Sequence, residues 1–508
     1  MVIMEKNVLE WLEKISRIHP DKIVYEDSSD KVTFYQAISE ARRIGSRLIE
    51  NVKDKAPIAV MLGRNVHTIT SYLGVIYSGH VYAPIDAALP EDRVNKILDA
   101  LKPAAILTDE ESYETASGYG KAIGCDVFKR EELNQGITLW PAINSIRKNM
   151  VDTDPLYIIF TSGSSGRPKG VITSHHSLMC YISAYTGVMN IGIHDKLGCQ
   201  SPLDYIAAIR DIYVPLKTGA STYLLPKEYF MQPDELFDLM NKQEITAIGW
   251  STSALTVLTQ LGAFSDTRLN TLNKICFSGS VMPGKVLRKW QENLTDAMFV
   301  NQYGPTEATA SCTYYRVDHV VEENEVIPIG IPYDNYKVFL LKEDNTEAAD
   351  GEEGEICVAG PCLALGYYRD VERTEASFVR NPLVDTYYER MYRTGDIGRY
   401  NKDGLLEFHG RRDRQVKHMG HRVELDEIEL AAGLAEGAGE CAALYNAEKE
   451  ALWLFYDGDI EKKDLVMTLR KELPGFMVPR KIKKLEKLPK LPNGKIDMSS
   501  LKELAGVK

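Results

Sequence analysis

Several features that mark other classes of protein are missing from this sequence of 508 residues. No apolar run approaches the length of a membrane-spanning helix, so membrane insertion is not expected. The eight cysteines form no Cys-x-x-Cys pair and no zinc-ligand spacing, which indicates buried thiols in a reducing compartment. The formal net charge of −12 disfavours binding to nucleic acid or to an anionic membrane surface. The sequence therefore predicts a cytoplasmic protein.

Short apolar strands alternate with segments of helical periodicity through most of the chain. The strand-like segments are PIAVML at 57–62, AAILT at 104–108 and YIIFT at 157–161. This alternation predicts the α/β class, with a large N-terminal domain of stacked α/β subdomains. From about residue 350, glycine-bounded strands such as GEICVAG predict a β-rich subdomain, and a small α+β domain follows it. We place the boundary near Asp413, between a domain of residues 1–412 and a domain of residues 413–508.

A loop of small residues, TSGSSGRPKG at 161–170, directly follows the strand-like segment YIIF. Its hydroxyls and backbone N–H groups allow close approach to phosphate oxygens, and a lysine adds positive charge. A flexible surface turn is the alternative, and the Walker spacing is absent, so the loop alone does not identify a nucleotide. The candidate phosphate-binding residues are Thr161, Ser162, Gly163, Ser164, Ser165, Gly166 and Lys169.

The loop resembles the signature of the adenylate-forming superfamily of acyl-CoA synthetases, nonribosomal-peptide adenylation domains and luciferases. Further motifs follow in the family's order: NQYGPTEAT at 301–309, GYYRD at 366–370, YRTGD at 392–396, GRRDRQVK at 410–417 and LPNGK at 491–495. Together with the stretch at 74–98, they most resemble stand-alone amino-acid adenylating enzymes of the D-alanine–carrier-protein ligase type. The resemblance implies ATP-dependent formation of an acyl-adenylate, followed by acyl transfer to a thiol with release of AMP.

The resemblance also assigns roles that the chemistry of the residues supports. The ring of Tyr303 is suited to stack on a purine, and Asp396 to accept hydrogen bonds from ribose hydroxyls. Arg411 is expected to reach ribose or phosphate, and Glu307 is a hard oxygen ligand suited to Mg²⁺. The other residues expected to line ATP are Asn301, Gln302, Gly304, Pro305, Thr306 and Phe408.

Two residues near the C-terminal domain are expected to act in the catalytic cycle. Lys495 lies in LPNGKID, where Pro, Asn and Gly favour a tight turn that presents the lysine. By the resemblance, this lysine enters the active site and neutralises charge in the adenylation transition state. Asp413 matches the hinge about which the small, mobile domain rotates between adenylation and thiol transfer.

The sequence departs from its relatives where an aspartate normally binds the substrate ammonium. In SPLDYIAAIRDIYVPLKTGAS at 201–221, Leu203–Asp204 looks like the usual Phe-Asp pair, but the ungapped register places Ile206 in the anchor position. A buried ammonium without a carboxylate is costly, so activation of an α-amino acid is in doubt and an aryl or other acid fits as well. Arg210 falls in another pocket position, with an outward-facing helix arginine as the alternative. The candidate pocket also contains Gly249, Ser278 and Ala310.

The sequence lacks the Gly-Gly-x-Ser signature of a carrier domain. The thiol acceptor is therefore expected in trans, as a phosphopantetheinyl carrier protein. An acyl- or aryl-CoA synthetase that uses free coenzyme A is the second hypothesis. A non-catalytic nucleotide-binding protein on the same fold is the third, and it is disfavoured because the motif residues Lys169, Glu307, Asp396, Arg411 and Lys495 are all present.

Overall fold

The computed structural model describes residues 5–163, 166–447, 449–490 and 496–506. The chain divides into two compact units, of which the first comprises 1–87, 101–159 and 170–412. The second comprises 88–100, 160–169 and 413–508. One division lies between Arg412 and Asp413, at the expected boundary, but the second unit also takes in two segments from the large domain. The hinge role of Asp413 stays a prediction.

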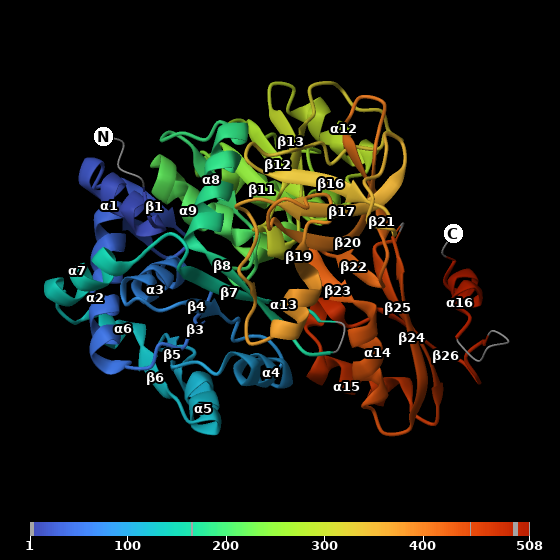
Figure 1. Ribbon diagram of the computed structural model, residues 1–508, viewed down its shortest axis with the longest axis horizontal. Helices are drawn as coiled ribbons and strands as arrows, with labels where there is room; N and C mark the ends of the chain where they lie inside the picture. The colour runs from blue at the N-terminus through green and yellow to red at the C-terminus, as the bar shows by residue number, and fades with distance from the viewer. Residues whose placement is uncertain (1–4, 164–165, 448, 491–495, 507–508) are drawn as a thin grey trace. The chain divides into compact units, whose positions relative to one another are not determined.

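The first unit contains a seven-stranded sheet in the order β18-β8-β7-β4-β3-β5-β6. Its strands are β3 (Ile58–Met61), β4 (Tyr82–Pro84), β5 (Ala105–Thr108), β6 (Asp126–Lys129), β7 (Pro155–Thr161), β8 (Lys169–Ser174) and β18 (Gly366–Tyr367). The associated helices are α1 (Val8–Ile18), α2 (Phe34–Asn51), α3 (Val66–Tyr77), α5 (Tyr113–Ile123), α6 (Arg130–Asn134), α7 (Trp140–Asn149) and α8 (His175–Met189). Every residue of β3 and of β5 is buried, as in a parallel sheet covered on both faces. Helices α1, α2, α3 and α7 gather beside this sheet (Figure 1).

A nine-stranded sheet of the same unit has the order β15-β14-β13-β12-β11-β9-β10-β1-β2. Its strands are β1 (Ile23–Glu26), β2 (Lys31–Thr33), β9 (Lys196–Cys199), β10 (Ser221–Leu224), β11 (Ala247–Ser251), β12 (Lys274–Ser278), β13 (Met298–Tyr303), β14 (Thr313–Arg316) and β15 (Ile331–Pro332). Its helices are α9 (Ala208–Thr218), α10 (Pro233–Lys242), α11 (Thr252–Gln260) and α12 (Gly284–Asn293), with 3₁₀ helix η1 (Lys227–Met231). Strands β9, β11, β12 and β13 run parallel, so their carboxyl ends meet at one edge, where ligands of such sheets bind.

An antiparallel sheet follows these two sheets along the chain, as the glycine-bounded strands predicted. It consists of β16 (Lys337–Leu341), β17 (Glu353–Ala359), β19 (Phe378–Arg380), β20 (Arg390–Tyr400) and β21 (Leu406–Arg411). Helix α13 (Val371–Ser377) begins at Asp370, whose carboxylate accepts a hydrogen bond from the backbone N–H of Arg373. The predicted α/β class with a β-rich subdomain is therefore confirmed.

The second unit combines helices with two small sheets. Its helices are α4 (Glu91–Leu101), α14 (Leu425–Gly433), α15 (Lys462–Glu472) and α16 (Met498–Ala505), with 3₁₀ helix η3 (Gly475–Met477). One sheet pairs β22 (Gln415–His418) with β23 (His421–Glu424), and the other has the order β24 (Ala438–Asn446), β25 (Ala451–Gly458), β26 (Lys481–Lys484). This part has the α+β composition expected of residues 413–508. In the described segments of both units, no helix combines the length and apolar character needed to cross a membrane.

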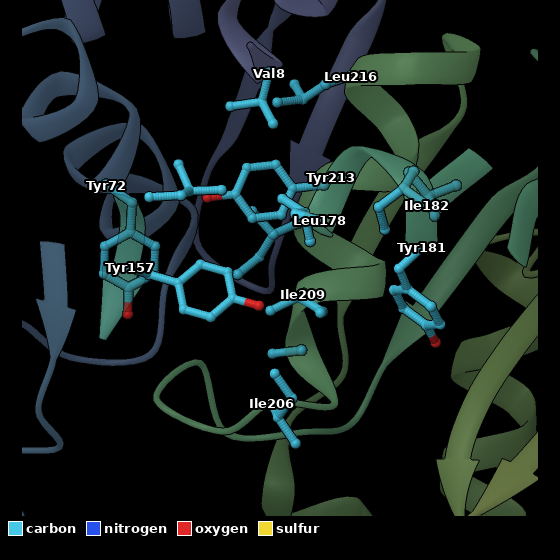
Figure 2. Packing of buried hydrophobic residues seen from close by; sticks show 14 of the residues in the cluster. Val8, Tyr72, Tyr157, Leu178, Tyr181, Ile182, Ile206, Ile209, Tyr213 and Leu216 are labelled. Atoms are coloured by element: carbon cyan, nitrogen blue, oxygen red, sulfur yellow. The ribbon is translucent and has the colours of Figure 1, made fainter. Parts of the chain in front are cut away.

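One large buried cluster joins the two parallel sheets of the first unit. Figure 2 shows Tyr72 of α3, Tyr157 of β7, Leu178 of α8 and Tyr213 of α9 meeting in this cluster. The Tyr213 hydroxyl lies 2.8 Å from that of Tyr82, so the polar ends of these rings are paired inside the core. Because α8 and α9 are both anchored here, the residues that they carry toward the site are held rigidly.

Candidate active site

A buried polar cluster joins residues from three of the family motifs. Asp396 on β20 lies directly opposite Arg411 on β21 in the antiparallel register, so residues far apart in sequence form a cross-strand pair. Arg411 Nη1 donates to Asp396 Oδ1, and Nη2 donates to the carbonyl of Thr394 at 3.2 Å. The hydroxyl of Tyr303, at the end of β13, donates to Asp396 Oδ2. Asp396 is only 4% exposed, so both bonds form away from bulk water.

Two aromatic rings lie beside this cluster. The ring centroids of Tyr303 and Phe408 are 6.3 Å apart, with their planes inclined at 39°. Burial and the neighbouring Asp396 raise the pKa of Tyr303 well above its ordinary value, so its hydroxyl stays protonated and donates. The structure thus brings together four residues that the sequence assigned to ATP: Tyr303, Asp396, Phe408 and Arg411.

The chain reverses sharply after β13. A Cβ at Gly304 would lie 2.4 Å from the Cα of Ser311, so only glycine fits this close approach. Thr309 and Ala310 have φ of 52° and 74°, which is a strained conformation, above all for a β-branched residue. The Thr309 hydroxyl donates to the carbonyl of Cys362 at 2.7 Å and helps to hold this turn.

Glu307 lies in this turn, on the 3₁₀ helix η2 (Thr306–Ala308). Its side chain is fully buried, and Oε1 accepts a hydrogen bond from the Tyr367 hydroxyl at 2.7 Å. In the part of the chain that the structure describes, no group of three or more His, Cys, Asp or Glu side chains could hold a metal ion. A magnesium–nucleotide site fits these residues nonetheless, because Mg²⁺ commonly binds one protein carboxylate together with phosphate oxygens and water.

The loop expected to bind phosphate connects β7 with β8. The backbone N–H of Gly166 donates to the carbonyl of Gly163 at 2.9 Å, and Gly166 has φ of +73°. The Ser162 hydroxyl donates to the carbonyl of Arg422 at 2.8 Å, within the second unit. Lys169 is the first residue of β8. Ser164, Ser165 and the predicted catalytic Lys495 lie outside the described residues.

One of the residues predicted to line the acid pocket is a buried arginine. Arg210 on α9 is 1% exposed, so it is not an outward-facing helix residue. Its Nη2 donates to the carbonyl of Gly249 at 3.0 Å, and Nη1 lies 3.3 Å from Gln302 Oε1 and 3.7 Å from Cys276 Sγ. These three partners belong to the adjacent strands β11, β12 and β13.

The other pocket residues named from the sequence lie along the same strands or the turn that follows them. Ser278 ends β12 opposite Gln302 in the register, and Ala310 lies in the strained turn after β13.

Asp204 and Ile206 lie in the turn that precedes α9. Ile206 is 8% exposed and belongs to the buried cluster (Figure 2). Burial, with a smaller contribution from the charge of Asp86, raises the pKa of Asp204 to about 6. Lys227 acts in the opposite direction. The structure thus gives the two candidate anchors different surroundings, one apolar and one acidic.

Sequence reasoning missed several residues of the site. Tyr367 belongs to the quoted motif GYYRD, but no role was assigned to it. Thr394 and two tyrosines of α8, Tyr181 and Tyr185, were also missed. The tyrosines stand at an i, i+4 spacing, which placed them on one helix face but gave no sign that the face borders the pocket.

Comparison with known proteins identifies the family of this chain. Residues 12–368 match the family described as AMP-binding enzyme. A D-alanine–D-alanyl carrier protein ligase of Bacillus cytotoxicus is 31% identical over 97% of this chain and 98% of its own length. Tyrocidine synthase 1 of Brevibacillus parabrevis is 28% identical over 98% of this chain, which spans only 45% of that protein.

A solved structure gives the same result for the fold. It is that of a nonribosomal peptide synthetase protein containing adenylation and PCP domains, bound to a vinylsulfonamide inhibitor. It superposes with a TM-score of 0.80 at 25% identity, covering 98% of this chain and 84% of the other. The resemblance inferred from the motifs is confirmed, and this chain belongs to the AMP-binding enzyme family.

Proposed function

We propose that this enzyme converts a small carboxylic acid and ATP into an acyl-adenylate and pyrophosphate, and then transfers the acyl group to a thiol with release of AMP. The observation that carries the proposal is the buried cluster of Tyr303, Asp396 and Arg411, formed by three separate family motifs. In this proposal the Tyr303 ring stacks on adenine and Asp396 accepts hydrogen bonds from the ribose.

Asp396 has the capacity for this role although two of its bonds are already made. A carboxylate offers about four lone-pair sites, and Tyr303 and Arg411 each use one on a different oxygen. Two ribose hydroxyls would therefore bind without displacing either partner. Arg411 orients the carboxylate, and hydrogen bonds that involve charged groups are stronger than neutral ones.

Glu307 and Lys495 would serve the reacting phosphates. Attack of a carboxylate on the α-phosphate brings anions together, and bound Mg²⁺ would supply part of the opposing charge. The Tyr367 hydroxyl donates to one oxygen of Glu307. This bond would orient the carboxylate so that its remaining lone pairs could bind the metal ion. Lys495 and the loop residues up to Lys169 would supply the remaining positive charge and hydrogen-bond donors.

We propose a phosphopantetheinyl carrier protein as the thiol acceptor, in the cytoplasm. This is supported by the likeness to a D-alanine–D-alanyl carrier protein ligase over nearly the whole of both chains. Free coenzyme A is the alternative acceptor. Incubation of the loaded enzyme with a phosphopantetheinylated carrier protein and, separately, with coenzyme A distinguishes the two, because each yields a thioester of different mass.

The acid in this proposal lacks an α-ammonium group. Ile206 offers such a cation only an apolar surface, and an unpaired buried charge costs several kcal/mol. Pyrophosphate exchange against amino, aryl and short aliphatic acids tests both the adenylation reaction and the choice of acid. No exchange with any acid, from enzyme that binds ATP, contradicts the adenylation. Exchange with an α-amino acid that Asp204→Ala abolishes and Ile206→Ala leaves intact contradicts only the choice of acid.

A further inference from the structure

Arg210 is a buried cation with an incomplete set of partners. In the described part of the chain no carboxylate forms an ion pair with its guanidinium, and its Nε has no hydrogen-bond partner. Arg64 shows what a satisfied structural arginine looks like in the same unit. Its Nε, Nη1 and Nη2 donate to the carbonyls of Ser201, Leu225 and Cys199 at 3.2, 3.0 and 2.8 Å.

Other buried donors around Arg210 are unsatisfied as well. Gln302 Nε2 and the hydroxyls of Tyr181 and Tyr333 have no hydrogen-bond partner, although each residue is at most 2% exposed. The rings of Tyr181 and Tyr333 meet edge to face at 6.2 Å, and the Arg210 guanidinium lies 5.8 Å from the ring centroid of Tyr185. Buried polar groups are normally paired, so a set dominated by donors calls for an acceptor-rich ligand.

The neighbouring carboxyl of Asp211 does not answer this need. Both of its oxygens lack hydrogen-bond partners, and no ion pair joins it to Arg210 among the described residues. Burial raises the pKa of Asp211 to about 7, although the charges of Arg210 and Arg64 act in the opposite direction. The remaining titratable groups that act on Arg210 are Tyr181, Tyr185 and Cys276, which are neutral at pH 7 because burial raises the pKa of each.

The fold makes room for the guanidinium at this place. A Cβ at Gly249 would lie 3.2 Å from Arg210 Nε and 3.3 Å from Cζ, so a side chain there would press on the cation. Gln302, to which Arg210 donates, directly precedes Tyr303 on β13. The residue that accepts from the cation is therefore adjacent in sequence to the proposed adenine platform, near the carboxyl end of β13.

We propose that Arg210, with Gln302 and Tyr181, binds a second acidic group of the substrate, which makes the activated acid a dicarboxylate. This inference rests on the proposed function and narrows its substrate class. The first carboxylate reacts with ATP, and the second supplies the counter-ion that the guanidinium lacks. A charged pair with bidentate geometry would also fix the depth at which the acid enters the pocket.

Pyrophosphate exchange with matched acid pairs tests the proposal. The pairs are malonate, succinate, glutarate and adipate, each against its half-amide, which keeps the shape but removes the second charge. We expect one diacid to exceed its half-amide by about a hundredfold in kcat/KM, as when a site loses the partner of a buried polar group. Arg210→Gln should abolish this ratio, whereas the control Arg64→Gln should preserve it. A neutral monoacid as the best substrate, or equal loss with both members of a pair, would overturn the inference and leave adenylation standing.

A second measurement does not depend on finding the acid. If the Arg210 cation lacks a counter-ion in the free enzyme, Arg210→Met should raise the melting temperature by about 1 to 2 °C, because an unpaired buried charge is removed. Arg64→Met, which deletes satisfied bonds to three carbonyls, should lower it. If Arg210→Met lowers the melting temperature as much as Arg64→Met does, Arg210 serves to hold the strands together, and the inference is wrong.

Discussion

The energetic link between Tyr303 and Asp396 is the sharpest test of the nucleotide site. Tyr303→Phe keeps the ring and removes one hydroxyl, while Asp396→Asn keeps the shape and removes the charge. Tyr303→Phe deletes a buried hydrogen bond to a charged group, and Asp396→Asn removes the charge of the acceptor. Either change should cost about 1.5 to 3 kcal/mol of unfolding free energy. Since Asp396→Asn weakens the Tyr303–Asp396 bond that Tyr303→Phe deletes, the double variant should be less unstable than the sum by about 1 to 2 kcal/mol.

Urea unfolding of the wild type, the two single variants and the double variant measures this coupling. Titration of the same proteins with AMP shows whether the changes also weaken ligand binding. We expect AMP to bind Asp396→Asn about ten- to a hundredfold more weakly, because the ribose loses a charged acceptor worth about 1.5 to 3 kcal/mol. Tyr400→Phe is the matched control: its hydroxyl donates to the carbonyl of Val338 from the same strand, β20. Its effect should simply add to that of Asp396→Asn. Additive behaviour of Tyr303→Phe as well would refute the hydrogen-bonded cluster as the core of the site.

Three further predictions concern the catalytic cycle and the pocket. Lys495→Ala should lower the rate of pyrophosphate exchange by about a hundredfold or more, while calorimetry still detects ATP binding. Exchange near the wild-type rate would contradict the catalytic role of Lys495. Asp413→Pro should fix φ at the expected hinge and impair one half-reaction far more than the other, whereas equal loss in a folded protein would count against a hinge. The raised pKa of Asp204 means that its share of the stability is present below pH 4 and lost as the pH rises through about 6. Asp204→Asn should therefore be more stable than wild type well above pH 6, by roughly 3 kcal/mol, and no gain in urea unfolding at pH 8 would contradict the raised pKa of this carboxyl.

Much of the fold could be predicted because parallel sheets leave a strong pattern in the sequence. The strand-like segment 57–62 contains β3, and 157–161 falls within β7, since strands buried on both faces require continuous apolar runs. The division between units was harder to predict. Segments 88–100 and 160–169 join the second unit through tertiary contacts that no local pattern records.

The candidate site could be predicted where motifs carry the chemistry. Asp396 and Arg411 were both named from the sequence, and their cross-strand pairing then followed from the register of β20 and β21. The partner of Glu307 could not be assigned in the same way. Tyr367 reaches it from β18, sixty residues further along the chain, so only the folded structure brings the two together.

The departures from the family pattern around α9 form a consistent change of charge. By the resemblance described above, the family places a carboxylate in the anchor position, which favours a cationic group on the substrate. In the ungapped register, which stays a prediction, Ile206 would provide no charge at that position, and Arg210 is a buried cation that contacts three neighbouring strands. If Ile206 is the anchor, an α-ammonium entering this site would meet a like charge and an apolar anchor, whereas an acidic group would meet a guanidinium that needs one. Since desolvated charges interact strongly, these two positions affect the choice of acid in the same direction, and a change at either alone should restore only part of the relatives' preference.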